Sequence, residues 1–301
     1  MATATETKTV AAVRILQVPR VLKKTVPVQF IATVGDMHVG HVLSIRPDHL
    51  NFEMRSGGEY PPLGKTGKYL LQCFDDFTSK VLNLKGSYAL VLMGDLIQGH
   101  RKCWTTELVI PDMLDQARAC IQLLKPIADK AQKKFLVEGT PFHDMEYSSH
   151  ELEIADRLGA DAAGVEINLR LSKFGNKVVN FVHGGSQAMA YRTTVLEREM
   201  LFSAGASEQG LYPQVHTIVR AHTHFALEVG YPGTKQAFIC PCWQLPIKYI
   251  AKTSVFRLQP KIGSVIIGPR RDLKGNPNGD IQAYWDCIYP AMRDLHKVYT
   301  V

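Results

Sequence analysis

Five apolar runs in this chain each end in histidine, aspartate or both, and this recurrence constrains the fold more than any other feature. The segments are GDMHVGH (35–41), GDLIQG (94–99), EGTPFHD (138–144), VHGG (182–185) and AHTH (221–224). The runs before them, 30–34, 88–93, 134–137, 178–182 and 217–219, are short and apolar, which predicts buried strands. Sites in open α/β sheets form outside the carboxyl ends of the strands, so we expect these five tips to converge on one pocket.

Two of the tips carry paired polar residues. Asp36 and His38 are two residues apart, as are His222 and His224. Side chains alternate along extended chain, so each pair can hold one ion from the same side. Aspartate and histidine suit borderline divalent metals, and two cations share a site only with anionic oxygen between them. Asp95 is the natural bridge.

The sequence therefore predicts a centre for two divalent cations. Mn²⁺, Fe²⁺, Zn²⁺ and Ni²⁺ all remain open as its metals, and His183, alone after its strand, can complete the second ion's shell. Two cations about 3.5 to 4 Å apart hold a bridging hydroxide and clamp a phosphoryl group during in-line displacement. Phosphate-ester hydrolysis is the reaction that best uses this arrangement. His143 is the candidate outside the metal shell to protonate the leaving alkoxide.

The order and content of the five segments resemble the calcineurin-like metallophosphoesterase superfamily. Its pattern, in words, is Asp-x-His, Gly-Asp, Gly-Asn-His-Asp/Glu, a lone His after a strand, and Gly-His-x-His. The matching segments run from residue 35 to residue 224, most of the chain. The resemblance implies an α/β fold in which a two-sheet β-sandwich is flanked by helices, giving four layers.

The resemblance also implies roles for individual residues. It assigns the first metal to Asp36, His38, Asp95 and His224, and the second to Asp95, His183 and His222. His143 matches the family's histidine that protonates the leaving group. Some members of this superfamily are binding subunits that have lost ligands, so a non-catalytic metal-binding scaffold is the rival from another class.

The chain departs from the family pattern at three places. Thr140 stands where the family has an asparagine ligand, and Pro141-Phe142 is inserted before the histidine. Thr140 is a candidate metal ligand, but a turn or capping role is equally favoured because threonine commonly bonds nearby backbone. The acidic or amide residue that is usual three positions after the bridging aspartate is here Gln98, which can hydrogen-bond but brings no charge. Ala221 replaces a glycine, which matters only where the backbone requires positive φ.

Other polar residues near the motifs have simpler interpretations. We expect His41 and His100 to face solvent or to contact the ligands from outside. Arg192 and Arg198 follow His183 and could bind phosphate, but the neighbouring glutamates 197 and 199 favour a solvated helix with local charge pairs.

Length and pattern predict one metallophosphoesterase-like domain over residues 1–301. With 46% hydrophobic residues the chain can bury a sizeable core. A loop (44–67) and a helix (69–84) form a predicted insertion at 44–84, and 243–301 is a predicted C-terminal decoration. Helices are expected at 111–131, kinked or divided at Pro126, and at 149–158. We expect the remaining elements to complete a second sheet. They are a hairpin over 169–181, strands at 226–229 and 237–239, a strand pair over 257–267 ending at Pro269, and a turn at 276–280.

Composition bounds the compartment and the partners. The chain shows neither an apolar signal core nor a membrane-length apolar run, so we expect a soluble, cytoplasmic protein without a membrane partner. The six cysteines lack the dense spacing of a disulfide framework and are expected to be reduced thiols. The oligomeric state is left open.

The substrate is predicted less sharply than the reaction. A net charge of +7 favours an anionic partner, although basic runs are more often solvated surface. Trp243, Tyr249 and Phe256 lie among basic residues, a mix that can stack bases and pair phosphates, although a place in the hydrophobic core is slightly favoured for them. A phosphodiesterase acting on nucleic acid or nucleotides, as a nuclease for example, is the leading interpretation. A phosphomonoesterase or protein phosphatase is the chemical rival.

Overall fold

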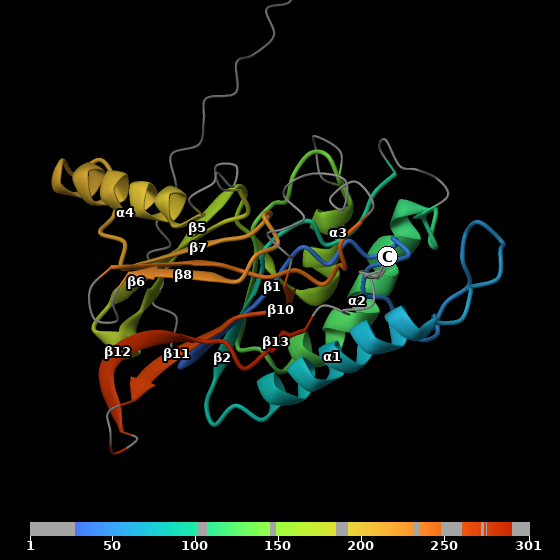
Figure 1. The fold of residues 1–301 in the computed structure, drawn as a ribbon, viewed down its shortest axis with the longest axis horizontal. Coiled ribbons are helices and arrows are strands. Elements are labelled where there is room, and N and C mark those ends of the chain that lie inside the picture. The colour runs from blue at the N-terminus through green and yellow to red at the C-terminus, as the bar shows by residue number, and fades with distance from the viewer. Residues whose placement is uncertain are drawn as a thin grey trace, which may run out of the picture.

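The protein is built from two central β-sheets with helices on both outer faces (Figure 1). The structure is a computed structural model that describes residues 28–100, 107–144, 149–184, 192–230, 235–247, 261–271, 274 and 276–290. Residues 1–27 and 248–260, which carry Tyr249, Phe256 and much of the basic sequence, lie outside the described residues, as does Cys103.

The first sheet has the strand order β12-β11-β1-β2-β3-β4. Four of its strands run parallel, namely β1 (Phe30–Val34), β2 (Tyr88–Leu92), β3 (Lys133–Leu136) and β4 (Asp161–Ala162). The antiparallel strands β11 (Ile266–Arg271) and β12 (Pro277–Tyr284) extend the sheet beyond β1. The first three parallel strands were all predicted, within a residue or two at each end, from their short apolar runs.

The second sheet has the strand order β5-β6-β7-β9-β8. Its middle strands β6 (Lys177–Val182), β7 (Thr217–Arg220) and β9 (Gln236–Ile239) are parallel. The outer strands β5 (Glu166–Leu171) and β8 (Leu227–Gly230) are antiparallel to their neighbours. The predicted hairpin is β5 and β6, joined through the short 3-10 helix Ser172–Phe174. Strands β10 (Ile262–Gly263) and β13 (Ile288–Tyr289) form a separate small pair.

The helices divide between the two outer faces, which confirms the predicted four-layer fold. Helices α1 (Lys65–Leu82), α2 (Met113–Lys130) and α3 (Ser149–Leu158) lie on the side of the first sheet, and α4 (Arg192–Glu208) lies beside the second (Figure 1). Alternate side chains of β1 point to opposite faces of the first sheet and so enter different layers of the core. Ala32 packs toward α1 and α2, whereas Ile31 joins Phe181 and Phe238 between the sheets. A third apolar cluster, which includes Leu196 and Ile218, joins α4 to the second sheet.

Trp243 belongs to the core. Its side chain is fully buried, its ring packs edge-on against Phe74 of α1 at a centroid distance of 4.9 Å, and its Nε1 donates to Ser264 Oγ at 3.0 Å. Trp243 therefore has the core role, and base stacking by this residue is ruled out. Phe74 and Phe77, whose rings pack against Trp243, come from the predicted 44–84 insertion, so that segment helps to form the main core. The division of the chain into insertion and decoration stays a prediction.

Three local predictions need correction. Helix α2 is not divided at Pro126 but runs continuously to Lys130, and a kink at this proline stays a prediction. Pro126 is exposed, so water can satisfy the carbonyl that loses its helical bond. Strand β11 continues past Pro269 because it pairs with β1 only at Ile266 and Ile267, so no ladder bond to β1 is required at the proline.

The third error concerns the end of the chain. The predicted turn at 276–280 is instead the start of β12, because the β11–β12 hairpin extends to the pairing of Arg271 with Pro277. These two strands also join the first sheet and not the second. They cover the edge of β1, which would otherwise leave unpaired backbone groups.

Candidate metal centre

The first two predicted tips lie side by side at the carboxyl end of the first sheet. Strands β1 and β2 pair in parallel with Val34 opposite Leu92, so the residues that follow them are abreast. The Asp36 N–H donates to the Gly94 carbonyl at 2.9 Å, and the His38 N–H donates to the Asp95 carbonyl at 3.1 Å. The backbone therefore fixes the Asp36–His38 tip directly against the Asp95 tip.

The third tip packs against the second through two glycines. Gly94 has a φ of +75°, and a Cβ atom added there would lie 2.4 Å from the Cα of Gly139. An added Cβ on Gly139 would lie 2.3 Å from the Asp95 nitrogen. Only residues without a side chain permit this approach. It places Thr140 and His143 beside Asp95.

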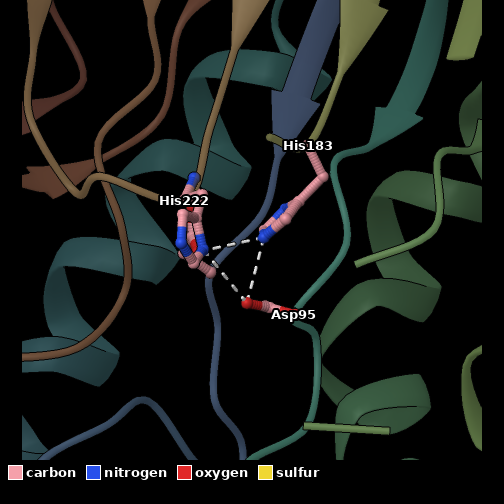
Figure 2. A group of neighbouring side chains, drawn as sticks. Asp95, His183 and His222 are labelled. Atoms are coloured by element: carbon pink, nitrogen blue, oxygen red, sulfur yellow. Dashed lines mark hydrogen bonds and ion pairs between the residues drawn. The ribbon is translucent and has the colours of Figure 1, made fainter. Parts of the chain in front are cut away.

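The remaining tips come from the second sheet. His183 follows β6, and His222 and His224 follow β7, which pairs in parallel with β6. The His222 N–H donates to Asp36 Oδ2 at 2.8 Å, so the β7 tip is bonded to the β1 tip of the other sheet. Figure 2 shows His183 and His222 directed toward Asp95. The carboxyl ends of both sheets thus meet at one place, as expected from the sequence.

Backbone conformation marks the same residues. Among the described residues, six other than glycine have positive φ; apart from Asn176 they are candidate ligands, with φ of 47° at Asp36, 47° at His38, 48° at Asp95, 72° at His222 and 61° at His224. Such conformations are costly and cluster at functional sites. Ala221 does not share the positive φ of its neighbours, so the replacement of the family's glycine carries no backbone cost.

The side chains form two overlapping groups with the spacing that metal ligands need. Asp36 Oδ1 lies 3.2 Å from His224 Nε2, 3.7 Å from His38 Nε2 and 3.8 Å from His183 Nε2. Asp95 Oδ2 lies 3.0 Å from His183 Nε2 and 3.8 Å from His222 Nδ1. Ligands about 2.0 to 2.2 Å from one ion lie roughly 3 to 3.6 Å apart, close to this range.

The grouping differs in one respect from the predicted ligand assignment. One group of potential ligands is Asp36, Asp95, His183 and His222, and another is Asp36, His38 and His224. Asp36 is therefore common to both, whereas Asp95 was predicted to be the shared residue. Asp95 also lies in a third group, with His38 and His143. The structure brings together every predicted ligand, and metal ligation by each of them stays a prediction.

Unpaired buried atoms support a fit to cations. Asp36 Oδ1 and His183 Nε2 are buried and lack a hydrogen-bond partner among the described residues, although each lies near an oppositely charged group. The Nε2 atoms of His38 and His224 face each other at 3.1 Å. Buried polar groups are normally hydrogen-bonded, so these buried atoms, directed at one place without such a bond, fit the binding of a cation between them.

Thr140 contacts the bridge candidate directly. Its backbone N–H donates to Asp95 Oδ1 at 2.6 Å, and its hydroxyl lies 3.0 and 3.1 Å from the two carboxylate oxygens of Asp95. Because the hydroxyl is bonded to this carboxylate, the arrangement favours the turn and positioning role over ligation.

His143 lies at the edge of the centre. Its Nδ1 is 2.8 Å from the Gln98 carbonyl, which must accept, so Nδ1 carries a proton. Its Nε2 lies 3.9 Å from Asp95 Oδ2, and its ring centroid lies 4.4 Å from that of His38. The other ring nitrogen, Nε2, therefore faces the candidate metal ligands.

The charges of the centre are strongly coupled. Burial opposes ionisation of Asp36, but His224 and His183 outweigh it and lower the pKa of Asp36 to about 2. Burial likewise disfavours protonated His183, yet Asp95 and Asp36 raise its pKa to about 10. Burial, with His143 and His224 nearby, holds the pKa of His38 well below its ordinary value. Without metal, the anionic cluster thus retains protons where cations would bind.

Sequence reasoning missed one buried residue beside the centre. Glu151, in the first turn of α3, accepts from Leu96 N–H at 3.1 Å and from Gly139 N–H at 2.8 Å. It therefore clamps the β2 and β3 tips together. Burial and the nearby Asp95 charge raise the pKa of Glu151 to about 7. The sequence places a glutamate in a helix's first turn, which also suits an ordinary exposed residue, so no local signal could have identified it.

The other polar residues have structural roles. His41 is buried, not solvent-facing, and lies 3.3 Å from Glu107, while His100 is exposed. The Gln98 side chain accepts from Gln244 at 3.2 Å. Glu199 pairs with the buried Arg220 of β7 at 2.7 Å, a partner outside its own helix. Local charge pairs along this helix stay a prediction. The side chain of residue 192 lies outside the described part of the chain.

Two further predictions can be compared with the described residues. Within them, Cys73, Cys120, Cys240, Cys242 and Cys287 are free thiols, as expected. No helix in the described part of the chain is both long enough and apolar enough to cross a membrane.

The fold and the site define a four-layer α/β protein with a candidate dinuclear metal centre where the carboxyl ends of two sheets meet. No protein-family model and no curated protein matches this chain. Solved structures do match over most of its length. One is wild-type Vps29 from Entamoeba histolytica complexed with Zn²⁺, at 12% identity and a TM-score of 0.39, covering 85% of this chain and 97% of that one.

Two further structures bear names related to phosphate esters. A predicted phosphoesterase from Streptococcus pneumoniae is 10% identical with a TM-score of 0.34, over 86% of this chain and 99% of that one. A 5'-nucleotidase precursor from Thermus thermophilus is 11% identical with a TM-score of 0.37, over 85% of this chain and 54% of that one. Similarity at this level does not decide between a catalytic and a non-catalytic protein.

Proposed function

We propose that this protein is a metal-dependent phosphoesterase of the calcineurin-like type that holds two divalent cations. The observation that carries the proposal is the meeting of six aspartate and histidine side chains from four strand ends. Two of their buried atoms, Asp36 Oδ1 and His183 Nε2, lack a hydrogen-bond partner among the described residues. No ordinary packing role explains why five of these six residues take up left-handed backbone at one place.

The residues divide between the two cation positions by their contacts. Asp36, His38 and His224 would hold one cation, and Asp36, Asp95, His183 and His222 would hold the other. Bound cations of this kind supply Lewis acidity and an activated water to phosphoryl transfer. The protein's own contribution is a buried, rigid set of anionic and imidazole ligands. His222, with its side chain 46% exposed, is the ligand nearest to solvent.

His143 is placed to act as the general acid. Its Nδ1 proton is held by the Gln98 carbonyl, so a second proton on Nε2 can be given to the leaving oxygen. Its side chain is only 14% exposed, which limits competing exchange with water. His143 Nδ1 is not available to bind a metal, because it is already hydrogen-bonded to the Gln98 carbonyl.

For the substrate, we favour a phosphodiester of nucleic acid or a nucleotide. The net charge of +7 supports an anionic partner through long-range attraction. Trp243 adds nothing to this choice because it is buried in the core. The proposed substrate class therefore rests on charge and on the chemistry of the centre, with phosphomonoesters as the alternative.

The test is a metal-dependence assay on bis-p-nitrophenyl phosphate beside p-nitrophenyl phosphate, with Mn²⁺, Ni²⁺, Fe²⁺, Zn²⁺ or chelator. We expect turnover that requires metal, prefers the diester, and disappears in Asp95→Asn. Asp129→Asn is the matched control, because Asp129 is an exposed carboxylate that pairs with Lys125 on the surface. Turnover that survives in Asp95→Asn would remove Asp95 from the centre.

A non-catalytic metal-binding protein is the second candidate. The observation that favours it is the Thr140 hydroxyl, which is bonded to Asp95 where the family has an amide ligand. A folded protein that binds metal but turns over neither ester with any metal would support this candidate over the enzyme.

A further inference from the structure

The segment between Thr140 and Asp144 holds an exposed aromatic ring beside the candidate acid. Phe142 is 46% exposed, which is high for a large apolar residue, and it is one of the two residues inserted before His143. Its ring centroid lies 5.1 Å from that of His143, with the ring planes at 70°. An exposed phenylalanine on a surface loop needs no explanation by itself. Phe142 does need one, because it lies at the end of a series of aromatic rings that starts at the metal centre.

Three rings lead outward from the metal centre. His38 is buried among the ligands, His143 lies 4.4 Å from it and is slightly exposed, and Phe142 adjoins His143 and is open to solvent. A phosphate group at the centre with its leaving oxygen near His143 would therefore have the next part of its leaving group near Phe142.

The loop that carries Phe142 is anchored at both ends. Thr140 N–H is bonded to Asp95, and His143 N–H donates to the Thr140 carbonyl at 3.2 Å, which closes a turn around Pro141 and Phe142. At the other end, the Asp144 carboxylate accepts from the Glu151 N–H at 2.9 Å. A Cβ atom on Gly99 would lie 2.1 Å from the His143 carbonyl oxygen, so the loop also packs against the β2 tip. The backbone at Phe142 is thus held in place before any ligand binds.

We infer that Phe142 is a specificity-determining residue that stacks a flat aromatic ring in the leaving group of the substrate. The ligand class is a phosphate ester with such a ring, either an aryl group or a nucleobase, near the scissile bond. Stacking on an aromatic side chain requires only a flat π face in the ligand, so it accepts different rings, and it strengthens binding substantially. This inference rests on the proposed function, because it takes the phosphate group to bind at the metal centre.

The experiment compares ligands that cannot be hydrolysed. Benzylphosphonate and cyclohexylmethylphosphonate have similar size and the same phosphonate group, and only the first has a flat π face. Their dissociation constants are measured by titration calorimetry on the full-length protein with Mn²⁺. We expect the benzyl compound to bind about tenfold more tightly to the wild type.

Three variants make the test specific. Phe142→Leu keeps apolar bulk and should abolish the preference for the benzyl compound, while Phe142→Trp should retain it. Leu211→Ala is the control, since Leu211 is 75% exposed on the turn after α4 and should leave the preference unchanged. If a uridine phosphonate also binds more weakly to Phe142→Leu than to the wild type, Phe142 stacks nucleobases as well as aryl groups. If its affinity is unchanged, the stacking role is restricted to aryl groups.

The outcomes separate this inference from the proposed function. Equal binding of the two phosphonates, no binding of either, or a benzyl preference that survives in Phe142→Leu overturns the stacking role. Ring-selective binding without hydrolysis of any ester overturns the enzymatic function and leaves the stacking role in place.

Discussion

Asp36 connects the two halves of the candidate centre at the scale of single residues. Its Oδ1 faces three histidines, and its Oδ2 accepts from the backbone of the β7 tip. One carboxylate thus serves as a potential ligand and as a tie between the sheets. Asp95 has a similar double role, because Thr140 and His183 both contact it. Loss of either carboxylate would remove one of the two counter-charges that face the buried histidines.

The role of His143 can be tested by measuring how the rate of hydrolysis depends on the leaving group of the ester. His143→Ala should slow esters with poor alkyl leaving groups by about 10²- to 10⁴-fold, because these need a proton, and should affect activated aryl esters little. Steady-state rates on the two classes of ester measure the effect. His100→Ala is the control, since His100 is exposed. Equal losses on both classes would exclude the acid role.

Metal affinity should depend on pH through the buried histidines. His183 has its pKa raised to about 10. Burial lowers the pKa of His224, but Cys242 and Asp36 outweigh it and hold that pKa well above its ordinary value. At neutral pH a cation must displace these protons, so the apparent affinity for Mn²⁺ should increase as pH increases toward 10, by up to about tenfold per unit for each proton displaced.

Calorimetric titration in buffers of different ionisation enthalpy counts those protons. We expect one to two protons released per binding event near pH 7, and fewer in His183→Gln. Binding without proton release would show that the histidines are already neutral in the metal-free protein.

Two elements shape the centre at the next scale, the glycine-containing tip of β3 and the first turn of α3. Gly139 lets the β3 tip contact the β2 tip, and Glu151 bonds to both. Asp144 in turn caps α3 through the backbone N–H groups of His150 and Glu151. The position of the Asp95 tip therefore depends on a helix that supplies no predicted ligand.

Gly139→Ala tests this contact. The added methyl group would meet Asp95 N at 2.3 Å and its Oδ1 at 2.4 Å, which forces the tips apart. We expect a loss of Mn²⁺ affinity of tenfold or more, measured by calorimetry, with the far-ultraviolet circular dichroism retained. Gly184→Ala is the matched control, because Gly184 follows the candidate ligand His183, its φ is not positive, and nothing lies within 4 Å of its added Cβ. Similar losses in both variants would contradict the contact argument.

The arrangement of the whole molecule explains why residues so far apart in sequence meet. The parallel strands of each sheet have their carboxyl ends at one edge, and the packing of the two sheets brings these edges together. Helices on both outer faces bury the remaining sides of the sheets. A cation held by tips of both sheets would therefore bind the native protein, in which the two sheets are packed together, and not the unfolded chain.

Metal should accordingly stabilise the whole fold. At a free Mn²⁺ concentration about 100 times the dissociation constant, the free energy of unfolding should rise by about 2.7 kcal/mol. Thermal unfolding followed by calorimetry should show a higher Tm with Mn²⁺ than with chelator in the wild type, and no difference in Asp95→Asn. An equal Tm in both conditions would mean that the native state does not bind the cation selectively.

The sequence by itself determined the local features of this protein. Short apolar runs ended by polar residues fixed the strands β1, β2, β3, β6 and β7 and the residues at their tips, because burial and side-chain alternation act within a few residues. It also identified the residues that meet, from Asp36 to His224. It could not assign Pro269 or residues 276–280, since whether a proline or a turn signal interrupts a strand depends on the neighbouring strand.

Only the tertiary structure decided which contacts those tips make. That Asp36 is shared between the two groups, that Thr140 bonds Asp95, that Glu151 clamps two tips and that Trp243 is core all depend on distances between segments remote in sequence. The physical reason is that pairing, burial and charge coupling are set by the packing of whole layers, which no local pattern encodes.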